Sequence, residues 1–356
     1  MKSRARIAVI GTGWWATATH IPAIREHPDA ELVALCDVSP ERVQAAAATY
    51  GVERTYTDHR ALLAAERPDA VVVATTHATH FGVARDCLEA GAHLLIEKPM
   101  TLFAADARAL TELATRCGRS IIIGTPWNYM AHARQAHERI ASGQLGPIQL
   151  VQCVFNSFNT DLIGGKDRSE HPGSYPVHGP GDVYSKKEHS GGGHGHLQMT
   201  HAASLLFFVS GLQISRVQAR MANHGLPLDL VDAMLVEFQG GALGTVSGTS
   251  NAFLSKSALH IGCANGSVDM DLFSGATIIR HAHGEPETLP HPAEPDLRFA
   301  PVRNLIGIAC GLEESLSPPE YGWRAVELLD AAYRSADADG QPITVEELYT
   351  SMRTTA

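Results

Sequence analysis

A glycine-rich segment near the N-terminus, Gly11-Thr12-Gly13-Trp14-Trp15-Ala16, constrains the fold of this chain more than any other feature. Residues 5–10 before it form a short apolar run that predicts a buried strand, and residues 16–24 after it can open a helix. Two glycines followed by a small residue, placed between a strand and a helix, are typical of a turn that binds a dinucleotide. The second glycine lets the backbone approach a pyrophosphate, which the positive helix N-terminus attracts. The alternative is an ordinary tight strand–helix turn, which has the same composition.

A second apolar run, residues 31–37, predicts a strand that ends in an acidic residue. This acid, Asp37, lies about twenty residues beyond the glycines, where a carboxylate that binds the ribose of a dinucleotide is expected. A carboxylate accepts hydrogen bonds from a ribose 2′-hydroxyl and repels a 2′-phosphate, so the sequence predicts NAD as the cofactor. Arg42 in the following helix can offset part of the repulsion, so the use of NADP stays open.

The composition argues against several classes of partner. A formal net charge of -10 speaks against a nucleic-acid partner. The sequence contains no stretch of membrane-spanning length, and its first apolar run is too short for a signal peptide. The six cysteines form no C-x-x-C pair, which is typical of reduced thiols. We therefore expect a cytoplasmic protein with no membrane partner. We also expect no metal site, since no Cys or acidic motif accompanies the histidines at positions 171, 178, 189, 194 and 196.

Strands and helices are expected to alternate from residue 1 to residue 124, which predicts a doubly wound parallel sheet. The expected helices cover residues 39–51 and 80–90, and further strands cover residues 69–74 and 93–96. The last of these strands ends in Glu97-Lys98-Pro99. Ligands meet an open α/β sheet at the carboxyl ends of its strands, so Lys98 is well placed for chemistry. The alternative is a surface Glu–Lys pair at a turn.

Beyond residue 147 the pattern changes to apolar runs separated by turn residues, which is typical of antiparallel hairpins. We expect strands at residues 148–155, 231–238, 243–246 and 258–263. A long segment rich in Gly, Pro, Asp and His, residues 156–193, separates the first of these strands from the others. Loops of that length in compact domains are usually functional, so we expect this one to cover the cofactor and contact a substrate.

Four motifs together resemble those of the Gfo/Idh/MocA oxidoreductase family: Gly11-x-Gly13, Asp37, Ala74-Thr75-Thr76-His77-x-x-His80 and Glu97-Lys98-Pro99-Met100. The similarity continues through Ser142-Gly143-x-Leu145-Gly146 to the closing helix at residues 322–335. The resemblance implies an NAD-binding Rossmann domain at residues 1–124. It also implies a substrate-binding and oligomerisation domain at residues 125–356, an α/β domain with a large open, mainly antiparallel sheet. In the family that sheet usually forms dimer interfaces, which implies a homodimer or homotetramer here. The closing helix belongs to this second domain and can pack back on the first.

The resemblance also implies the site residues. The family carries a glycine run, then an Asp, then a His one helical turn later; His201 matches that His, but Leu197 replaces the Asp. Gln198 precedes His201 by three residues and is a candidate to hydrogen-bond its ring. The alternative for His201 is a core histidine in an apolar stripe. The cofactor-binding candidates are Gly11, Gly13, Trp14, Trp15, Asp37, Thr75, Thr76, His77, His80, Glu97 and Lys98; the substrate-binding candidates are Lys98, Asn128, His194, His196, Gln198 and His201.

These residues lead to the hypothesis of an NAD-dependent oxidoreductase that takes hydride from a secondary hydroxyl of a sugar, cyclitol or related polyol. Lys98 and His201, assisted by Gln198, are the candidate catalytic residues, because both Lys and His can accept the hydroxyl proton. Three alternatives stay open. The first is a glycoside-cleaving enzyme that uses NAD for transient oxidation, the second is a cis-dihydrodiol dehydrogenase, and the third is a non-catalytic ligand-binding regulator.

Overall fold

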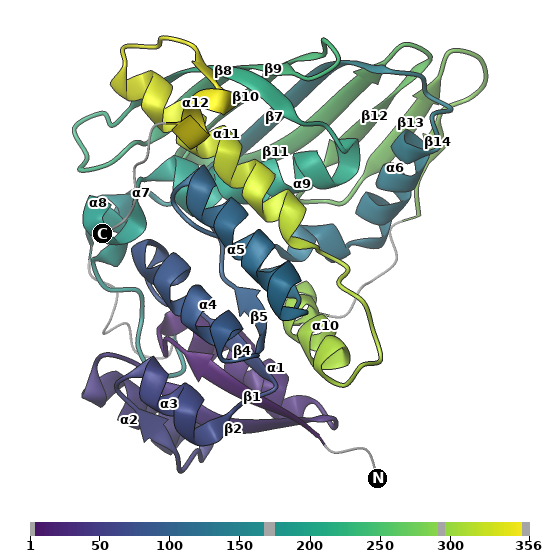
Figure 1. Cartoon of the computed structure of the whole chain (residues 1–356). Helices are drawn as coiled ribbons and strands as arrows, with labels where there is room; N and C mark the ends of the chain where they lie inside the picture. Colours follow the sequence, from purple (N-terminus) through teal and green to yellow (C-terminus); the bar gives the residue numbers. More distant parts are fainter. Residues whose placement is uncertain (1–3, 167–174, 291–295, 351–356) are drawn as a thin grey trace.

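The computed structural model describes residues 4–166, 175–290 and 296–350 (Figure 1). Its first sheet has six strands, all parallel, in the order β3-β2-β1-β4-β5-β6. These strands are β1 (Ala5–Ile10), β2 (Ala30–Cys36), β3 (Thr55–Tyr56), β4 (Ala70–Val73), β5 (His93–Ile96) and β6 (Ile121–Ile123). The helices between them are α1 (Ile21–Glu26), α2 (Pro40–Tyr50), α3 (His59–Glu66), α4 (His80–Glu89) and α5 (Ala104–Cys117). The predicted doubly wound parallel sheet is confirmed.

Alternate residues of β1 face opposite layers of helices, as expected for a strand buried on both faces. Ala8 and Ile10 pack in a core with α3, α4 and α5, whereas Ile7 and Val9 pack in a core with α1 and α2. The helix predicted at residues 39–51 begins with Ser39 as N-cap, whose Oγ accepts a hydrogen bond from the backbone amide of Arg42. The helix predicted at residues 16–24 instead starts with a π-helical turn (Ala16–His20) and continues as α1.

The second sheet has nine strands in the order β14-β13-β12-β11-β7-β10-β9-β8-β15. Its strands are β7 (Ile148–Phe158), β8 (Ile214–Ala222), β9 (Val231–Phe238), β10 (Leu243–Thr249), β11 (Asn251–Cys263), β12 (Gly266–Asp271), β13 (Thr277–His281), β14 (Glu287–Thr288) and β15 (Ile343–Thr344). All neighbours are antiparallel except β7 and β10, which are parallel. The predicted large, mainly antiparallel sheet is confirmed, although several strands are longer than expected.

Helices cover one face of this second sheet. They are α6 (Ala131–Ala141), α9 (Thr200–Ser210) and α11 (Pro319–Asp337), with α12 (Val345–Thr350) near the end of the described chain. α11 lies beside α5 between the two sheets (Figure 1). It contributes Trp323 and Val326 to the core of the first sheet and Leu328 and Leu329 to the core of the second. α10 (Ala300–Ala309) packs on the first sheet through Val302, Leu305 and Ile306.

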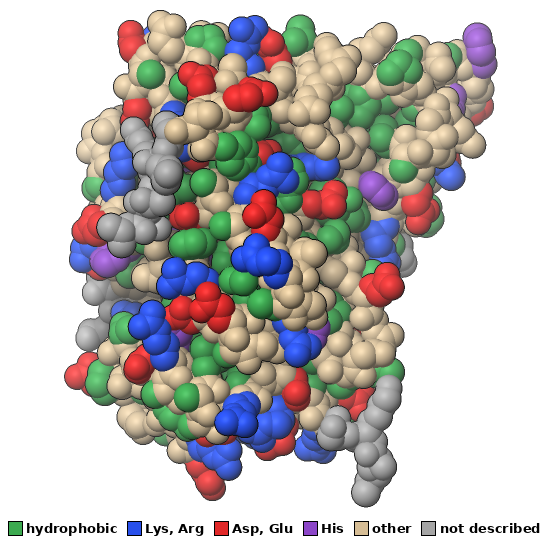
Figure 2. Space-filling model, in the orientation of Figure 1, with side chains coloured by type: hydrophobic (Ala, Val, Ile, Leu, Met, Phe, Trp, Pro, Cys, Tyr) green, Lys and Arg blue, Asp and Glu red, His purple; other side chains and the backbone are tan. Residues whose placement is uncertain are grey.

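The long segment predicted at residues 156–193 contains more structure than expected. It includes the end of β7, the short helices α7 (Thr160–Ile163) and α8 (Lys187–Ser190), and a 3-10 turn (Val183–Ser185). His171 lies outside the described residues. Figure 2 shows basic and acidic side chains interspersed over the viewed face of the molecule. Within the described ranges, no helix combines the length and the apolar character that a membrane span requires.

Candidate active site

The two glycines after β1 serve different purposes. Gly11 has φ +94°, and a Cβ there would lie 2.3 Å from the carbonyl oxygen of Ala74, so only glycine fits against the end of β4. A Cβ at Gly13 would meet no atom within 4 Å, so this side of the turn is open. The turn thus packs closely on the sheet at its first glycine and leaves room for a phosphate at its second.

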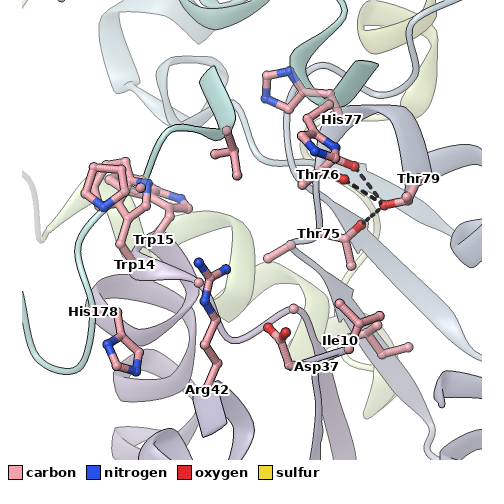
Figure 3. A pocket seen from close by; sticks show the side chains of 18 of the residues that line it. Ile10, Trp14, Trp15, Asp37, Arg42, Thr75, Thr76, His77, Thr79 and His178 are labelled. Atoms are coloured by element: carbon pink, nitrogen blue, oxygen red, sulfur yellow. Dashed lines mark hydrogen bonds between the residues drawn. The ribbon is translucent and has the colours of Figure 1, made fainter. Parts of the chain in front are cut away.

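A cavity of about 360 Å³ lies at the carboxyl ends of the first sheet's strands (Figure 3). It has the open glycine at its base and room for an elongated ligand, so its residues fit a dinucleotide. The predicted cofactor residues that line it are Gly11, Gly13, Trp14, Trp15, Asp37, Thr75, Thr76 and His77. The predicted His80, Glu97 and Lys98 are not among its lining residues.

Asp37 directly follows β2 and is held in place by the backbone around it. Its Oδ2 accepts hydrogen bonds from the Thr12 amide at 2.8 Å and the Thr12 hydroxyl at 3.1 Å, and its Oδ1 accepts one from the Ser39 amide at 3.0 Å. Arg42 lines the same part of the cavity. The carboxylate is therefore oriented in advance at the position expected for ribose binding.

The segment from His178 to Ser190 forms the opposite wall of the cavity. The Tyr184 hydroxyl accepts a hydrogen bond from Trp14 Nε1 at 3.2 Å, and His77 Nδ1 lies 2.9 Å from the carbonyl oxygen of Ser190. Among the residues that the structure describes, the buried Nε2 of His178 has no hydrogen-bond partner, and His178 lines the cavity. The length of the segment indicated such a role, but nothing in its spacing singled out Tyr184.

Glu97 connects the cavity wall to the catalytic candidates. The carboxylate accepts hydrogen bonds from Trp15 Nε1 at 2.9 Å and from the Lys98 amide at 3.2 Å, and His20 Nε2 lies 2.8 Å from it. Burial alone would raise the pKa of Glu97, but the hydrogen bond from His20 and the nearby positive charges lower it below its ordinary value. Behind it, the buried ring of His80 lies 2.8 Å from the carbonyl oxygen of Pro99 and 3.2 Å from that of Thr75. His80 therefore supports the loop and does not face the cavity.

Lys98 extends from the end of β5 to the second domain. Its Nζ donates a hydrogen bond to the carbonyl oxygen of Leu197 at 2.7 Å. Burial lowers the pKa of Lys98 to about 8, although the neighbouring carboxylate of Glu97 acts in the opposite direction. Such an amine changes its protonation state close to neutral pH, which suits a general base.

His201 is in the first turn of α9, and its ring centroid lies 5.6 Å from that of Trp127. Burial and, second, the charge of Lys98 lower the pKa of His201 to about 3. Across the described ranges its imidazole makes no hydrogen bond to the protein. The ring is therefore neutral near physiological pH, available to a substrate hydroxyl and a weak base.

The turn before α9 differs from the expected helix. Residues Gly195–Met199 form a π-helical turn, and the Leu197 side chain packs in an apolar cluster with Leu162, Ile163, Leu228 and Leu230. Gln198 is half-buried on this turn. His194 Nδ1 lies 2.8 Å from the Ser250 hydroxyl, and burial lowers the pKa of His194 and His196 to about 4.

Asn128, a predicted substrate contact, is fully buried, and its amide nitrogen lies within 3.0–3.3 Å of the hydroxyls of Thr125, Ser204 and Ser317. The amide nitrogen thus joins elements of the fold, whereas the buried Asn128 Oδ1 has no hydrogen-bond partner among the described residues. A substrate contact of Asn128 stays a prediction. Within residues 4–166, 175–290 and 296–350, no three His, Cys, Asp or Glu side chains gather closely enough to hold a metal ion.

Two family models match the chain. One is described as an oxidoreductase family with an NAD-binding Rossmann fold and matches residues 5–125; the other is the GFO/IDH/MocA C-terminal domain and matches residues 133–269. Together they cover the first sheet and the second sheet from β7 into β12.

Curated relatives match mainly over part of their length. The chain is 34% identical over 143 residues to D-apiose dehydrogenase of Paraburkholderia graminis, which is 40% of this chain and 38% of that protein. It is 32% identical over 149 residues to D-glucoside 3-dehydrogenase of Escherichia coli, which is 42% of each chain. These matches therefore span less than half of the relatives.

Solved structures match almost the whole chain. The WlbA dehydrogenase from Bordetella pertussis in complex with NADH and UDP-GlcNAcA has a TM-score of 0.77 at 25% identity, over 96% of this chain and 98% of that one. An inositol dehydrogenase homolog from Azotobacter vinelandii complexed with NAD+ has a TM-score of 0.80 at 21% identity, over 96% and 97%. The likeness to the Azotobacter vinelandii structure shows a shared fold.

Proposed function

Since the chain belongs to the Gfo/Idh/MocA oxidoreductase family, with an NAD-binding Rossmann domain, we propose that it is an NAD-dependent dehydrogenase that oxidises a secondary hydroxyl of a sugar, cyclitol or related polyol. The observation that carries this proposal is the buried Lys98 amine, which Leu197 fixes beside Glu97, the carboxylate that also binds Trp15 of the cavity wall. Relatives named as sugar dehydrogenases support the substrate class.

The nicotinamide supplies the hydride acceptor when the cofactor is bound. The chain's own groups handle the proton. Neutral Lys98 accepts the proton of the substrate hydroxyl, and the resulting ammonium is stabilised by the Leu197 carbonyl and the Glu97 carboxylate. His201, neutral and without a hydrogen bond to the described part of the chain, positions the hydroxyl by a hydrogen bond.

A substrate panel tests the proposal. Sugars, cyclitols and their glycosides are each mixed with NAD, and NADH formation is followed by its absorbance. We expect steady NADH production with at least one polyol. Cleavage of a glycoside without net NADH would instead show transient oxidation, and binding of sugar without any redox change would show a regulator.

We predict that NAD binds more tightly than NADP, because Asp37 is oriented to accept from the ribose and repels a 2′-phosphate. Asp37→Ala should reduce the difference between the two binding free energies by about 1–3 kcal/mol. Asp37→Asn is the comparison variant: it removes the charge and keeps an oxygen for the Thr12 amide, and it loses the acceptor for the Ser39 amide. Titration of both cofactors measures the effect, and a clear preference of the wild type for NADP contradicts it.

We also propose that the protein is a homodimer or homotetramer formed through the open face of the second sheet. Leu150, Leu235 and Leu243 on adjacent strands β7, β9 and β10 are 40–51% exposed, and Leu243 is in register with Leu150. Such a contiguous apolar face on a sheet typically forms an interface. Light scattering at micromolar concentration should give a multiple of 38.1 kDa, and Leu235→Arg with Leu243→Arg should give the monomer. A monomeric wild type refutes this assembly.

A further inference from the structure

The glycine run before α9 encloses two side chains that come from distant parts of the sequence. A Cβ at Gly192 would lie 2.1 Å from the Tyr333 hydroxyl, and one at Gly195 would lie 2.5 Å from the same atom. A Cβ at Gly193 would lie 2.1 Å from the carbonyl oxygen of Asp229. The glycines are therefore required by contacts within the protein, with α11 and with the loop before β9.

Asp229 binds three successive amides of this run. Its Oδ1 accepts from the Gly193 amide at 2.7 Å, its Oδ2 accepts from the Gly195 amide at 3.0 Å, and its carbonyl oxygen accepts from the His194 amide at 2.9 Å. Oδ1 also accepts from the Tyr333 hydroxyl at 3.0 Å. One carboxylate thus fixes the backbone conformation at the point where the π-helical turn begins.

Tyr333 supports the same turn from α11. Its ring stacks on the His196 ring, with centroids 4.5 Å apart and an interplanar angle of 23°. His196 is neutral near physiological pH, since burial lowers its pKa to about 4. Burial and the charge of Asp229 raise the pKa of the buried Asp232 well above its ordinary range. Among the described residues, neither side-chain oxygen of Asp232 has a hydrogen-bond partner, so the amides of the run bind Asp229.

The turn held by Asp229 and Tyr333 positions the groups used in the proposed reaction. The π-helical turn, Gly195–Met199, presents the Leu197 carbonyl to Lys98 Nζ at 2.7 Å, and α9 with His201 follows directly. A π turn is a rare and less stable geometry than an α-helical turn, so it persists where surrounding contacts hold it.

We propose that Asp229 and Tyr333 are positioning residues that hold residues 193–199 in the geometry in which the Leu197 carbonyl anchors Lys98. This inference rests on the proposed dehydrogenase function for its kinetic consequence. It assigns a role to two residues that do not touch the cofactor cavity, and it explains how Lys98 is fixed although position 197 has no carboxylate.

The test compares Tyr333→Phe with Tyr349→Phe. Each substitution removes one tyrosine hydroxyl that is bonded to a carboxylate, Asp229 for the first and Glu327 for the second, and Tyr349 lies in α12 away from the turn. The readouts are kcat, the affinity for NAD, and the pH dependence of Lys98 acylation measured by mass spectrometry. Glu97 acts on the pKa of Lys98, and the charge of Lys98 in turn lowers the pKa of His77, His80 and His201; both variants leave these groups in place.

We expect Tyr333→Phe to lower kcat roughly ten-fold, the effect of losing one hydrogen bond to a charged group, with the NAD affinity changed less than about two-fold. The Lys98 titration should move up from about 8 toward the ordinary lysine value, because a loosened turn admits water to a group whose pKa is lowered mainly by burial. This effect outweighs the weaker hydrogen bond to the Leu197 carbonyl, which alone would lower the pKa. Tyr349→Phe should change neither kcat nor the Lys98 titration. Asp229→Asn should shift the Lys98 titration in the same direction. If Asp229→Asn does not fold, the result for Tyr333→Phe alone decides the test.

An unchanged Lys98 titration and kcat in Tyr333→Phe would overturn the proposal, as would a loss of thermal stability equal in the two variants with no shift in titration. A wild type that oxidises no polyol would instead contradict the proposed function. The acylation experiment needs no substrate, so it still tests the positioning role in that case.

Discussion

Lys98→Ala is expected to lower kcat by roughly 10²–10⁴-fold, the usual contribution of a positioned acid–base group. The amine is buried, fixed at 2.7 Å from the Leu197 carbonyl, and has its pKa lowered to about 8, so it can accept a proton near neutral pH. The affinity for NAD should fall much less, because Lys98 does not line the cofactor cavity. Steady-state kinetics with the best substrate of the panel and an NAD titration measure the two effects.

Lys166→Ala is the matched control for this substitution, since Lys166 is exposed and ion-paired with Asp161. It should leave kcat unchanged. A Lys98→Ala enzyme that keeps more than about a tenth of wild-type kcat would contradict the assignment, because a general base contributes at least about a hundred-fold. In that case His194, His196 and Gln198 are the next residues to substitute.

Leu197→Asp is expected to destabilise the protein by about 3 kcal/mol or more, because it places a carboxyl group in an apolar cluster. The Leu197 side chain is 4% exposed and packs with Leu162, Ile163, Leu228 and Leu230. The substitution restores the residue type that the family carries at this position. It should not restore activity, however, since the turn that anchors Lys98 depends on this packing. Urea unfolding measures the free-energy change.

The pH dependence of the free energy of unfolding distinguishes the effect of the new charge from the effect of the lost packing. Burial raises the folded-state pKa of the new carboxyl above its unfolded value. The folded variant therefore binds the proton more tightly than the unfolded variant. Its loss of unfolding free energy relative to the wild type is smallest below about pH 4 and grows as pH rises. Leu197→Asn loses the same packing without adding a titrating group. Its loss of unfolding free energy relative to the wild type should therefore not change with pH. A stable Leu197→Asp with higher kcat would show that position 197 faces the reacting groups.

Much of the first domain follows from local sequence. The apolar run before the glycines became β1, Ser39 capped α2, and Asp37 lay directly after β2, because each depends on neighbouring residues only. The order of strands also follows from general rules for doubly wound sheets. The antiparallel strands β9 and β10 were predicted from two apolar runs separated by turn residues, here Gly240-Gly241.

The candidate site was less predictable, because its geometry depends on contacts between distant residues. The contact of Lys98 with Leu197 joins residues 99 positions apart, and that of Tyr333 with Asp229 joins residues 104 apart. The π-helical turn at Gly195–Met199 has no compositional signature, so the packing of Leu197 with Leu162, Ile163, Leu228 and Leu230 did not follow from helical spacing. The burial of Asn128 among three hydroxyls was equally invisible without the tertiary structure.

The pH dependence of kcat for polyol oxidation by the wild type and by His201→Ala tests most directly whether Lys98 is the proton acceptor. A base acts in its deprotonated form, so the rate should rise with pH and level off above about 8, the pKa of Lys98. His201, whose pKa is lowered to about 3, is neutral throughout this range, so His201→Ala should lower kcat by less than Lys98→Ala and keep the same rise. Loss of the rise in His201→Ala, or a larger fall in kcat than in Lys98→Ala, would contradict the account and assign the proton to His201.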